Sequence, residues 1–245
     1  MNEQFLRLGM MLGGAAMDKL WGSHVCVLGL GGVGSWCAEA LARSGVGELT
    51  LMDHDEVGLS NLNRQAEALH STLGQPKAKA MADRVRDISP DCQVHPVQGR
   101  YEAGTREAFF SGGYDYIVDA IDLVSCKLDL IETALGRGVP IISALGTGNK
   151  LDGSLLRVSD LSRTEGCPLA RVVRKELRAR GIQHHKVVWS PEEPRPSDQL
   201  EAPPPGRRSV PASAVWVPAV AGLLLAGEVV KDLTGDGAPA RGSSF

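Results

Sequence analysis

Three of the four glycines in residues 25–34 form the first pattern that could do chemistry. The apolar run Val-Cys-Val-Leu leads into Gly29, Gly31 and Gly34, which have the spacing G-x-G-x-x-G. Glycines with this spacing let the backbone turn tightly and approach a phosphate, and the amides and dipole at the start of a following helix attract the same anion. The pattern predicts a nucleotide-phosphate site between a buried strand and a helix.

A carboxylate stands at the end of the next apolar run. Asp53 follows Leu49-Thr-Leu-Met and lies 19 residues after Gly34. At this spacing an acidic side chain in a Rossmann-like unit hydrogen-bonds the ribose hydroxyls of a nucleotide. The chain therefore begins with half of a Rossmann-like unit.

Polar and cationic residues beyond Asp53 favour ATP over NAD. They are Ser60, Asn61 and Arg64 in the stretch SNLNRQ, and Lys77 after Gly-Gln-Pro. A dinucleotide's phosphates are held largely by backbone amides, whereas Asn, Arg and Lys side chains suit a triphosphate with a leaving pyrophosphate. We predict ATP as the ligand. An NAD-dependent redox protein, or a nucleotide-binding protein without catalysis, is the alternative that these side chains count against.

Two aspartates near the end of a later strand offer a ligand for a metal ion. Asp119 closes an apolar stretch, and Asp122 follows just beyond it, at the sheet edge where open α/β folds bind ligands. A carboxylate close to a triphosphate is a natural ligand for Mg²⁺. The other role for an aspartate here is the N-cap of a helix over residues 125–137. The two residues can divide these roles, and we assign the metal to Asp122.

The elements that must position these residues alternate between strand and helix. We expect strands at residues 24–29, 48–53, 92–97, 114–119 and 139–144, and helices at 33–44, 76–88, 105–111 and 125–137. Such alternation requires parallel pairing with right-handed crossovers. The predicted fold class is α/β, with a Rossmann-like, doubly wound and mostly parallel sheet.

The chain of 245 residues, 43% of them hydrophobic, is long enough for one large core. We expect a single domain with a lead-in at 1–22, an ATP-binding core at 23–145, and an extension at 146–235 for substrate and dimer contacts. The extension contains a strand at 154–158, a basic helix at 168–180 and a mobile proline-rich loop at 191–211. The apolar stretch 209–227 is broken by proline and glycine, which predicts a buried helix at 218–233 and no membrane span.

The net charge of −3 offers no general attraction to nucleic acid, so RNA would need a local basic surface. Residues 163–186 carry an excess of positive charge. A solvated helix face is the other interpretation of this charge. The candidate tRNA contacts are Arg171, Arg174 and Arg178 on the expected helix, with Arg207 and Arg208 on the proline-rich loop.

The five cysteines stand singly, and no C-x-x-C pair occurs. This excludes zinc-ribbon and thioredoxin motifs, and the absence of a signal peptide fits a reducing cytoplasm. We expect Cys26 and Cys37 to pack in the core. Cys167 is the cysteine that we expect to be accessible, without a catalytic role.

The order GxGGxG, Asp, SNLNRQ, GQPK and DAID resembles the adenylation domain of the ThiF, MoeB and ubiquitin-activating enzymes over residues 5–145. This resemblance implies an enzyme that adenylates a carboxylate with MgATP. By position, Gly31 and Gly32 approach the phosphates and Asp53 binds the ribose. The remaining implied roles are phosphate contacts by Asn61, Arg64 and Lys77, Mg²⁺ ligation by Asp122, and an Arg7 that reaches across a homodimer to the partner's ATP.

Within this family the sulfur-carrier activators have two zinc-binding C-x-x-C pairs, which this chain lacks. Residues 5–13, 39–47, 61–65 and 160–164, together with Pro168-Leu-Ala, are similar to the tRNA threonylcarbamoyladenosine dehydratase branch. This implies adenylation of the modified adenosine's carboxylate in tRNA, followed by cyclisation of the side chain with loss of AMP. Adenylation of the C-terminal glycine of a ubiquitin-like sulfur carrier stays as the alternative.

Some members of that branch have a cysteine just before the C-terminal apolar helix. Residues 210–215, Val-Pro-Ala-Ser-Ala-Val, contain none. The sequence therefore gives no support to a sulfur relay through this segment, although a sulfur-transfer protein stays open as a partner. The cyclisation needs no enzyme thiol, because an internal nucleophile of the activated side chain needs only positioning.

Overall fold

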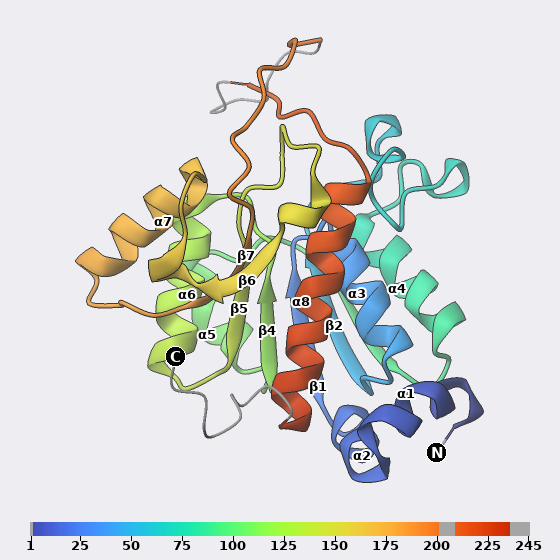
Figure 1. The fold of residues 1–245 in the computed structure, drawn as a ribbon. Helices are drawn as coiled ribbons and strands as arrows, with labels where there is room; N and C mark the ends of the chain where they lie inside the picture. The colour runs from blue at the N-terminus through green and yellow to red at the C-terminus, as the bar shows by residue number, and fades with distance from the viewer. Residues whose placement is uncertain (1, 201–208, 236–245) are drawn as a thin grey trace.

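A computed structural model describes residues 2–200 and 209–235, which form a layered α/β structure around one sheet of seven strands (Figure 1). The order of the strands across the sheet is β3-β2-β1-β4-β5-β7-β6, and all pairs are parallel except β6 with β7. The strands are β1 (His24–Leu28), β2 (Glu48–Asp53), β3 (Gln93–Gln98), β4 (Tyr116–Asp119), β5 (Ile141–Ala144), β6 (Arg157–Asp160) and β7 (Lys186–Trp189). The predicted α/β class and the mostly parallel, doubly wound sheet are confirmed.

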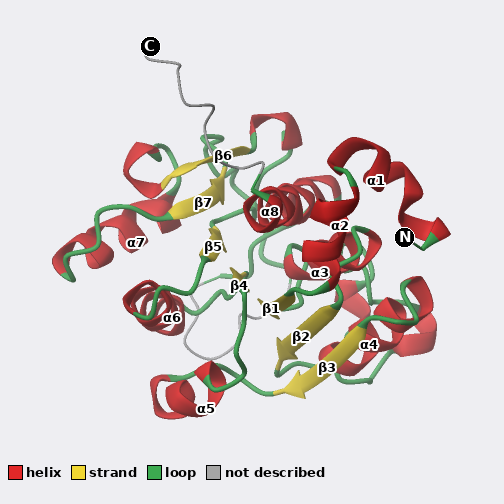
Figure 2. Cartoon of the chain, turned by 90° about the horizontal axis from the view of Figure 1, so that it is seen from below, coloured by secondary structure: helices red, strands yellow, loops and turns green. Residues whose placement is uncertain are grey.

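Helices cover both faces of the sheet, with α3, α4 and α8 on one side and α6 and α7 on the other (Figure 2). The helices are α1 (Leu6–Leu12), α2 (Gly14–Trp21), α3 (Gly34–Arg43), α4 (Lys77–Ile88), α5 (Arg106–Phe110), α6 (Val124–Gly136), α7 (Pro168–Ala179) and α8 (Trp216–Thr234). Side chains alternate along β1, so that Val25 and Val27 enter the first core and Cys26 and Leu28 the second. A central strand buried on both faces explains why its sequence is apolar throughout.

The extension after residue 145 adds two strands to the same sheet. The strand expected at 154–158 begins instead at Arg157, because residues 153–155 form a 3₁₀ turn whose N-cap, Asp152, accepts a hydrogen bond from Ser154 N at 2.9 Å. β7 was not predicted, since its four residues are too short to show a strand period. It lies between β5 and β6 and pairs parallel with β5.

The C-terminal apolar stretch forms α8, which packs against α3, as the prediction of a buried helix requires (Figure 1). In the described part of the chain, no helix has the length and apolarity that crossing a membrane needs. Residues 191–200 and 209–215 contain no helix or strand. Residues 201–208 of the expected mobile loop lie outside the described residues.

Close contact between α8 and α3 depends on Gly222. A Cβ atom at this position would lie 2.4 Å from the Val33 carbonyl oxygen and 2.9 Å from the Cys37 amide nitrogen. These neighbours are backbone atoms, so that the two helices would have to move apart.

We therefore expect Gly222→Ala to lower the free energy of unfolding by about 1–3 kcal/mol, as overpacking does in other cores. The matched control is Gly227→Ala on the same helix, because a Cβ there meets no atom within 4 Å. The control should raise stability by up to about 1 kcal/mol through helix propensity. Urea denaturation of both variants measures the two effects, and equal stabilities would contradict the packing argument.

Candidate active site

The site lies at the carboxyl ends of β1 and β4, the neighbouring strands where the chain order reverses across the sheet. Open α/β sheets bind ligands at such a switch point because the loops that follow the two strands diverge. Here the two loops begin in contact, since Ala120 N donates a hydrogen bond to Leu28 O at 2.9 Å. A Cβ on Gly29 would lie 2.6 Å from Ala120 O, and one on Gly34 would lie 1.8 Å from Gly29 O. These two glycines are therefore needed for the packing of the loops themselves.

Gly31 and Gly32 have different surroundings. A Cβ on Gly31 would meet no atom closer than Gln65 Nε2 at 3.9 Å, whereas one on Gly32 would lie 3.1 Å from Pro218 and 3.3 Å from Arg64. The protein leaves room in front of Gly31 and packs closely around Gly32. The open side of Gly31 is what a phosphate needs for a close approach to the backbone.

Asp53 connects the glycine loop to the end of β2. Its Oδ2 accepts a hydrogen bond from Leu30 N at 2.6 Å, and its Oδ1 accepts one from Asp55 N at 2.8 Å. The side chain is 7% exposed. Each carboxylate oxygen has a further lone pair, so that the group can still accept hydrogen bonds from ribose hydroxyls.

Residues 60–65 cross the start of α3 beside the glycine loop. Trp36 Nε1 donates to Arg64 O at 3.0 Å, and the Arg64 guanidinium donates to Ser60 O and Asn63 Oδ1 at 2.8 Å each. Asn61 Oδ1 accepts from Gly58 N at 2.9 Å and holds the turn. The segment is thus anchored by side chains that the sequence assigned to phosphates, and the Arg64 guanidinium keeps further N–H groups for a ligand.

Lys77 begins α4 and points its ammonium group at Asp55. The distance from Nζ to Asp55 Oδ2 is 3.2 Å, and the Lys77 side chain is 7% exposed. The side chain is therefore placed beside the segment after β2, with an exposed carboxylate as its partner. A phosphate group could replace that carboxylate without burying a new charge.

Asp119 and Asp122 differ in environment. Asp119 is fully buried and accepts hydrogen bonds from Lys127 Nζ and Ser143 Oγ, each at 2.6 Å. Asp122 lies three residues further on an exposed part of the same loop. The N-cap residue of α6 is Leu123, so that the alternative N-cap role for the two aspartates is wrong.

Two side-chain partners of Asp119, Lys127 and Ser143, and the histidine that contacts Ser143 were not identified from the sequence. Lys127 also donates to Ala144 O at 3.0 Å, and His185 Nε2 lies 2.7 Å from Ser143 Oγ. Burial lowers the pKa of His185 to about 3, and the Lys127 charge acts in the same direction, so the imidazole is neutral. Because Ser143 gives its one proton to Asp119, it accepts the proton of Nε2. The signal in the sequence that could have identified the buried pair is Lys127, a lysine on the apolar face of the helix expected at 125–137.

Arg7 on α1 lies near the amino ends of the strands, whereas the glycine loop lies at their carboxyl ends (Figure 1). The 3₁₀ turn Glu3–Phe5, which leads directly into α1, lies at the end of α4, where Gln4 Nε2 donates to Ile88 O at 2.7 Å. Lys77 is at the other end of α4, about 17 Å away for a helix of twelve residues. Arg7 is therefore not part of the site in its own chain.

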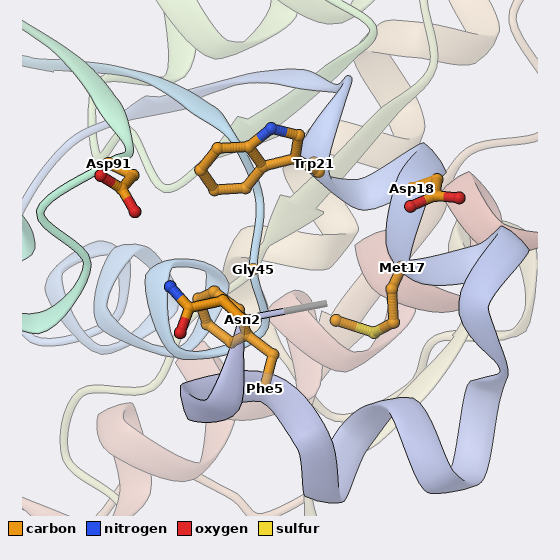
Figure 3. Close-up of a pocket in the computed structure, with 7 residues that line it drawn as sticks. All are labelled: Asn2, Phe5, Met17, Asp18, Trp21, Gly45 and Asp91. Atoms are coloured by element: carbon orange, nitrogen blue, oxygen red, sulfur yellow. The ribbon is translucent and has the colours of Figure 1, made fainter.

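A hollow lies between the 3₁₀ turn Glu3–Phe5 that precedes α1, the helix α2 and the turn after α3 (Figure 3). It contains no residue that the sequence assigned to ATP. The residues that line it are Asn2, Phe5, Met17, Asp18, Trp21, Gly45 and Asp91.

The predicted basic helix is α7, which packs against α6. Arg171 and Arg178 are exposed, whereas Arg174 is half-buried and donates to Thr164 O at 2.6 Å. Arg174 is thus committed to the fold. Arg207 and Arg208 lie outside the described residues.

Cys167 precedes α7 and is 3% exposed, so the expectation that it is accessible is wrong. Its Sγ would lie 3.6 Å from a Cβ on Gly146, which places the start of α7 beside the loop after β5. Cys26 and Cys37 are buried in the core, as predicted.

A family model described as the ThiF family matches residues 3–244. The chain belongs to the ThiF family. It is 42% identical over 245 residues to a tRNA threonylcarbamoyladenosine dehydratase of Bacillus subtilis, covering 96% of each chain. It is 33% identical over 154 residues to a molybdopterin-synthase adenylyltransferase of Salmonella typhimurium, covering 63% of this chain and 60% of the relative.

Solved structures give the same result. The Escherichia coli tRNA N6-threonylcarbamoyladenosine dehydratase, TcdA, in complex with ATP superposes with a TM-score of 0.86 at 33% identity, covering 96% of this chain and 95% of that chain. The same enzyme in complex with AMP has a TM-score of 0.85. This ThiF-family chain therefore shares both sequence and fold with an enzyme solved in complex with ATP and with AMP.

Proposed function

We propose that this protein is an ATP-dependent tRNA threonylcarbamoyladenosine dehydratase, an AMP-forming cyclase. The observation that carries the proposal is the 42% identity to the Bacillus subtilis enzyme along 96% of both chains. The open side of Gly31, Asp53 beside the same loop, and the Arg64 and Lys77 cations of the segments after β2 fit the ATP that such an enzyme uses. We place the reaction in the cytoplasm, where tRNA and ATP are available.

The chemistry is carboxylate activation. The carboxylate of the modified adenosine attacks the α-phosphate of ATP, and pyrophosphate leaves. The side chain's own nucleophile then attacks the mixed anhydride, the ring closes, and AMP leaves with the carboxylate oxygen. The net loss is one water, and the protein contributes binding, orientation and stabilisation of the charge on the leaving groups.

We assign the ATP-binding roles as follows. The loop from Gly29 to Gly34 faces the phosphates, mainly through Gly31, and Asp53 accepts from the ribose. Lys77 exchanges Asp55 for a phosphate oxygen, since its ammonium group is already directed toward an anion. Further phosphate contacts come from Ser60, Asn61 and Arg64.

Mg²⁺ would be held by Asp122 together with phosphate oxygens. The group of three close ligand residues found among residues 2–200 and 209–235 is Asp53, His54 and Asp55, and it does not include Asp122. One carboxylate suffices, however, because Mg²⁺ in phosphoryl-transfer sites takes most of its ligands from phosphates and water. When bound, the ion supplies charge stabilisation for the leaving pyrophosphate.

The alternative is adenylation of a ubiquitin-like sulfur carrier, which the likeness to the molybdopterin-synthase adenylyltransferase supports. The two functions share ATP chemistry and differ in the acceptor. AMP release is therefore measured with tRNA that carries threonylcarbamoyladenosine, with unmodified tRNA, and with a carrier protein ending in Gly-Gly. Release that needs the modified tRNA supports the proposal, and release that needs the carrier supports the alternative. A sulfur-transfer partner follows only from the second outcome.

For the metal assignment, we expect Asp122→Ala to lower AMP formation at least about a hundredfold, because a metal ion contributes several kcal/mol to charge stabilisation at a transferring phosphate. The melting temperature should stay near that of the wild type, since Asp122 is exposed. The control is Asp83→Ala, an exposed aspartate in the middle of α4. Near-normal turnover of Asp122→Ala would refute the metal role.

We further propose that Arg7 acts on the ATP of a partner subunit in a symmetric homodimer. Arg7 lies far from its own glycine loop, and α1 exposes Met10 and Met11, each 82% accessible. Such apolar exposure on a short helix suits a contact with a second copy of this chain.

Complementation tests this arrangement. Arg7→Ala and Lys77→Ala protomers should each be inactive alone, and mixing them should restore one complete site per heterodimer. Subunit exchange is checked with two affinity tags. If exchange occurs and no activity returns, Arg7 does not act across the dimer.

For tRNA, we propose contacts from Arg171 and Arg178 on α7, extended by Arg207 and Arg208. Arg171 lies in the first turn of α7, next to the loop after β5, and is closer to the site than Arg178. Arg174 belonged to the predicted set, but its bond to Thr164 makes its loss a structural change as well.

Arg171→Ala/Arg178→Ala should weaken tRNA binding and flatten its salt dependence, because each phosphate contact adds roughly 0.7–0.9 to the log–log slope. The KM for ATP should not change. The matched control is Arg86→Ala/Lys231→Ala. These changes remove two positive charges in the last turns of α4 and α8, near the amino ends of the strands and away from the candidate site. An unchanged slope would return α7 to the interpretation of a solvated face.

A further inference from the structure

Glu67 is a buried carboxyl group without a hydrogen-bond partner. It lies in the loop between residues 60–65 and α4 and is 1% exposed. Neither carboxyl oxygen has a partner in hydrogen-bond geometry among the described residues, and the same holds for Oε1 of Gln65. Buried polar groups normally have partners because their desolvation is costly, so an unpaired carboxyl group beside a ligand site calls for a functional explanation.

The surroundings of Glu67 belong to the ATP site. The charged groups that face it are Lys77 from the start of α4 and Asp53 from the end of β2. The Ser35 hydroxyl at the start of α3 is also beside it, but it donates to Gly31 O at 2.7 Å and accepts from Ala66 N at 3.1 Å. Glu67 therefore lies behind the glycine loop, between the proposed ribose and phosphate contacts.

The backbone keeps Glu67 in this place. Thr72 Oγ1 donates to Glu67 O at 2.8 Å, and the flanking Ala66 and Ala68 amides donate to Ser35 Oγ and to Gln65 O. These bonds fix the backbone of the loop around Glu67, whose side chain is buried.

Burial raises the pKa of Glu67 from its ordinary value of 4.5 to about 7, with Asp53 acting in the same direction and Lys77 against it. Burial therefore favours the protonated form of this carboxyl group near neutral pH far more than it would be favoured for an exposed glutamate. The Lys77 charge favours ionisation of Glu67. In this structure Lys77 is paired with Asp55.

We propose that Glu67 is a further residue of the nucleotide site, which takes up a proton when the triphosphate binds. The inference rests on the proposed ATP site. A triphosphate at Lys77 brings more negative charge than the Asp55 carboxylate that it replaces. The ionised form of Glu67 is then repelled, whereas the protonated form is not, so that binding draws a proton from solvent.

The sign of the pH dependence follows from linkage. Because the complex binds more protons than the free protein, affinity for the nucleotide is highest below pH 7 and falls as the pH rises through the pKa of Glu67. Each unit by which binding raises that pKa corresponds to about a tenfold loss of affinity at high pH.

Isothermal titration calorimetry provides the test. A non-cleavable α,β-methylene analogue of ATP is titrated with excess Mg²⁺ at pH 7, in buffers that differ in ionisation enthalpy, so that the protons taken up are read from the slope. The wild type should take up a substantial fraction of a proton, and its Kd should rise roughly 3- to 10-fold between pH 6 and pH 8.5. Glu67→Gln should take up none and keep a nearly constant Kd.

The matched control is Glu39→Gln. Glu39 is also buried, but it is paired with Arg43 at 2.9 Å and Arg84 at 2.6 Å on the outer side of α3 and α4. Glu39→Gln should take up as many protons on nucleotide binding as the wild type, even though its free energy of unfolding is lower. Glu67→Gln should instead gain stability with rising pH relative to the wild type, since an ionised Glu67 is unfavourable in the folded state.

The outcomes separate the two proposals. Two results would show that protonation of Glu67 is not coupled to nucleotide binding. One is proton uptake by Glu67→Gln equal to that of the wild type, and the other is nucleotide binding by the wild type without proton uptake. Failure of the wild type to bind the analogue would overturn the ATP site itself and this inference with it. Should Glu67→Gln fold poorly, infrared difference spectra of the wild type decide: nucleotide binding should increase the protonated-carboxyl band, and an unchanged band contradicts the proposal.

Discussion

The buried ion pair of Asp119 and Lys127 is the interaction on which the geometry of this site depends. Both side chains are fully buried, and their charges are matched by Ser143 Oγ, Ala144 O and Ile121 N. Removing one partner from such a pair leaves an uncompensated charge, which typically costs about 3–5 kcal/mol. The pair attaches α6 to the ends of β4 and β5. It thereby sets the position of the loop that carries Asp122 and contacts the glycine loop after β1.

The glycines of the first loop serve two physical purposes. Gly29 and Gly34 are required because any side chain would collide with backbone atoms of the adjoining turn, whereas Gly31 keeps a space open that protein atoms do not fill. Tight packing on one side of the loop thus keeps the other side accessible. Behind the same loop, both carboxyl oxygens of Glu67 and Oε1 of Gln65 are buried without a hydrogen-bond partner among the described residues.

The residues assigned a function in one chain lie at opposite ends of the strands. Residues assigned to ATP, and Arg171 of those assigned to tRNA, lie toward the carboxyl ends of the strands, while α1 with Arg7 packs at the amino ends (Figure 1). Strand direction imposes this separation, because a lead-in that precedes β1 must end where β1 begins. A contribution of Arg7 to catalysis would consequently need the second subunit that we propose, and α1 exposes Met10 and Met11.

The sequence by itself determined the α/β class, the first five strands to within about two residues, and the grouping of Gly31, Asp53, Arg64 and Lys77. These features follow from local periodicity and from a motif whose spacing is set by one strand, one turn and one helix. The buried helix near the C-terminus was predictable for the same reason, since proline and glycine interrupt its apolar run.

Tertiary structure alone decided the place of β7 between β5 and β6, the pairing of Lys127 with Asp119, and the burial of Cys167 and Glu67. Each depends on contacts between segments distant in the sequence, which local patterns do not encode. Arg174 shows the same limit: its charge and spacing match those of Arg171, yet its bond to Thr164 becomes evident only when helix and loop are packed together. A charged residue's role is set by its neighbours in space, because burial and pairing change the free energy of its charged form.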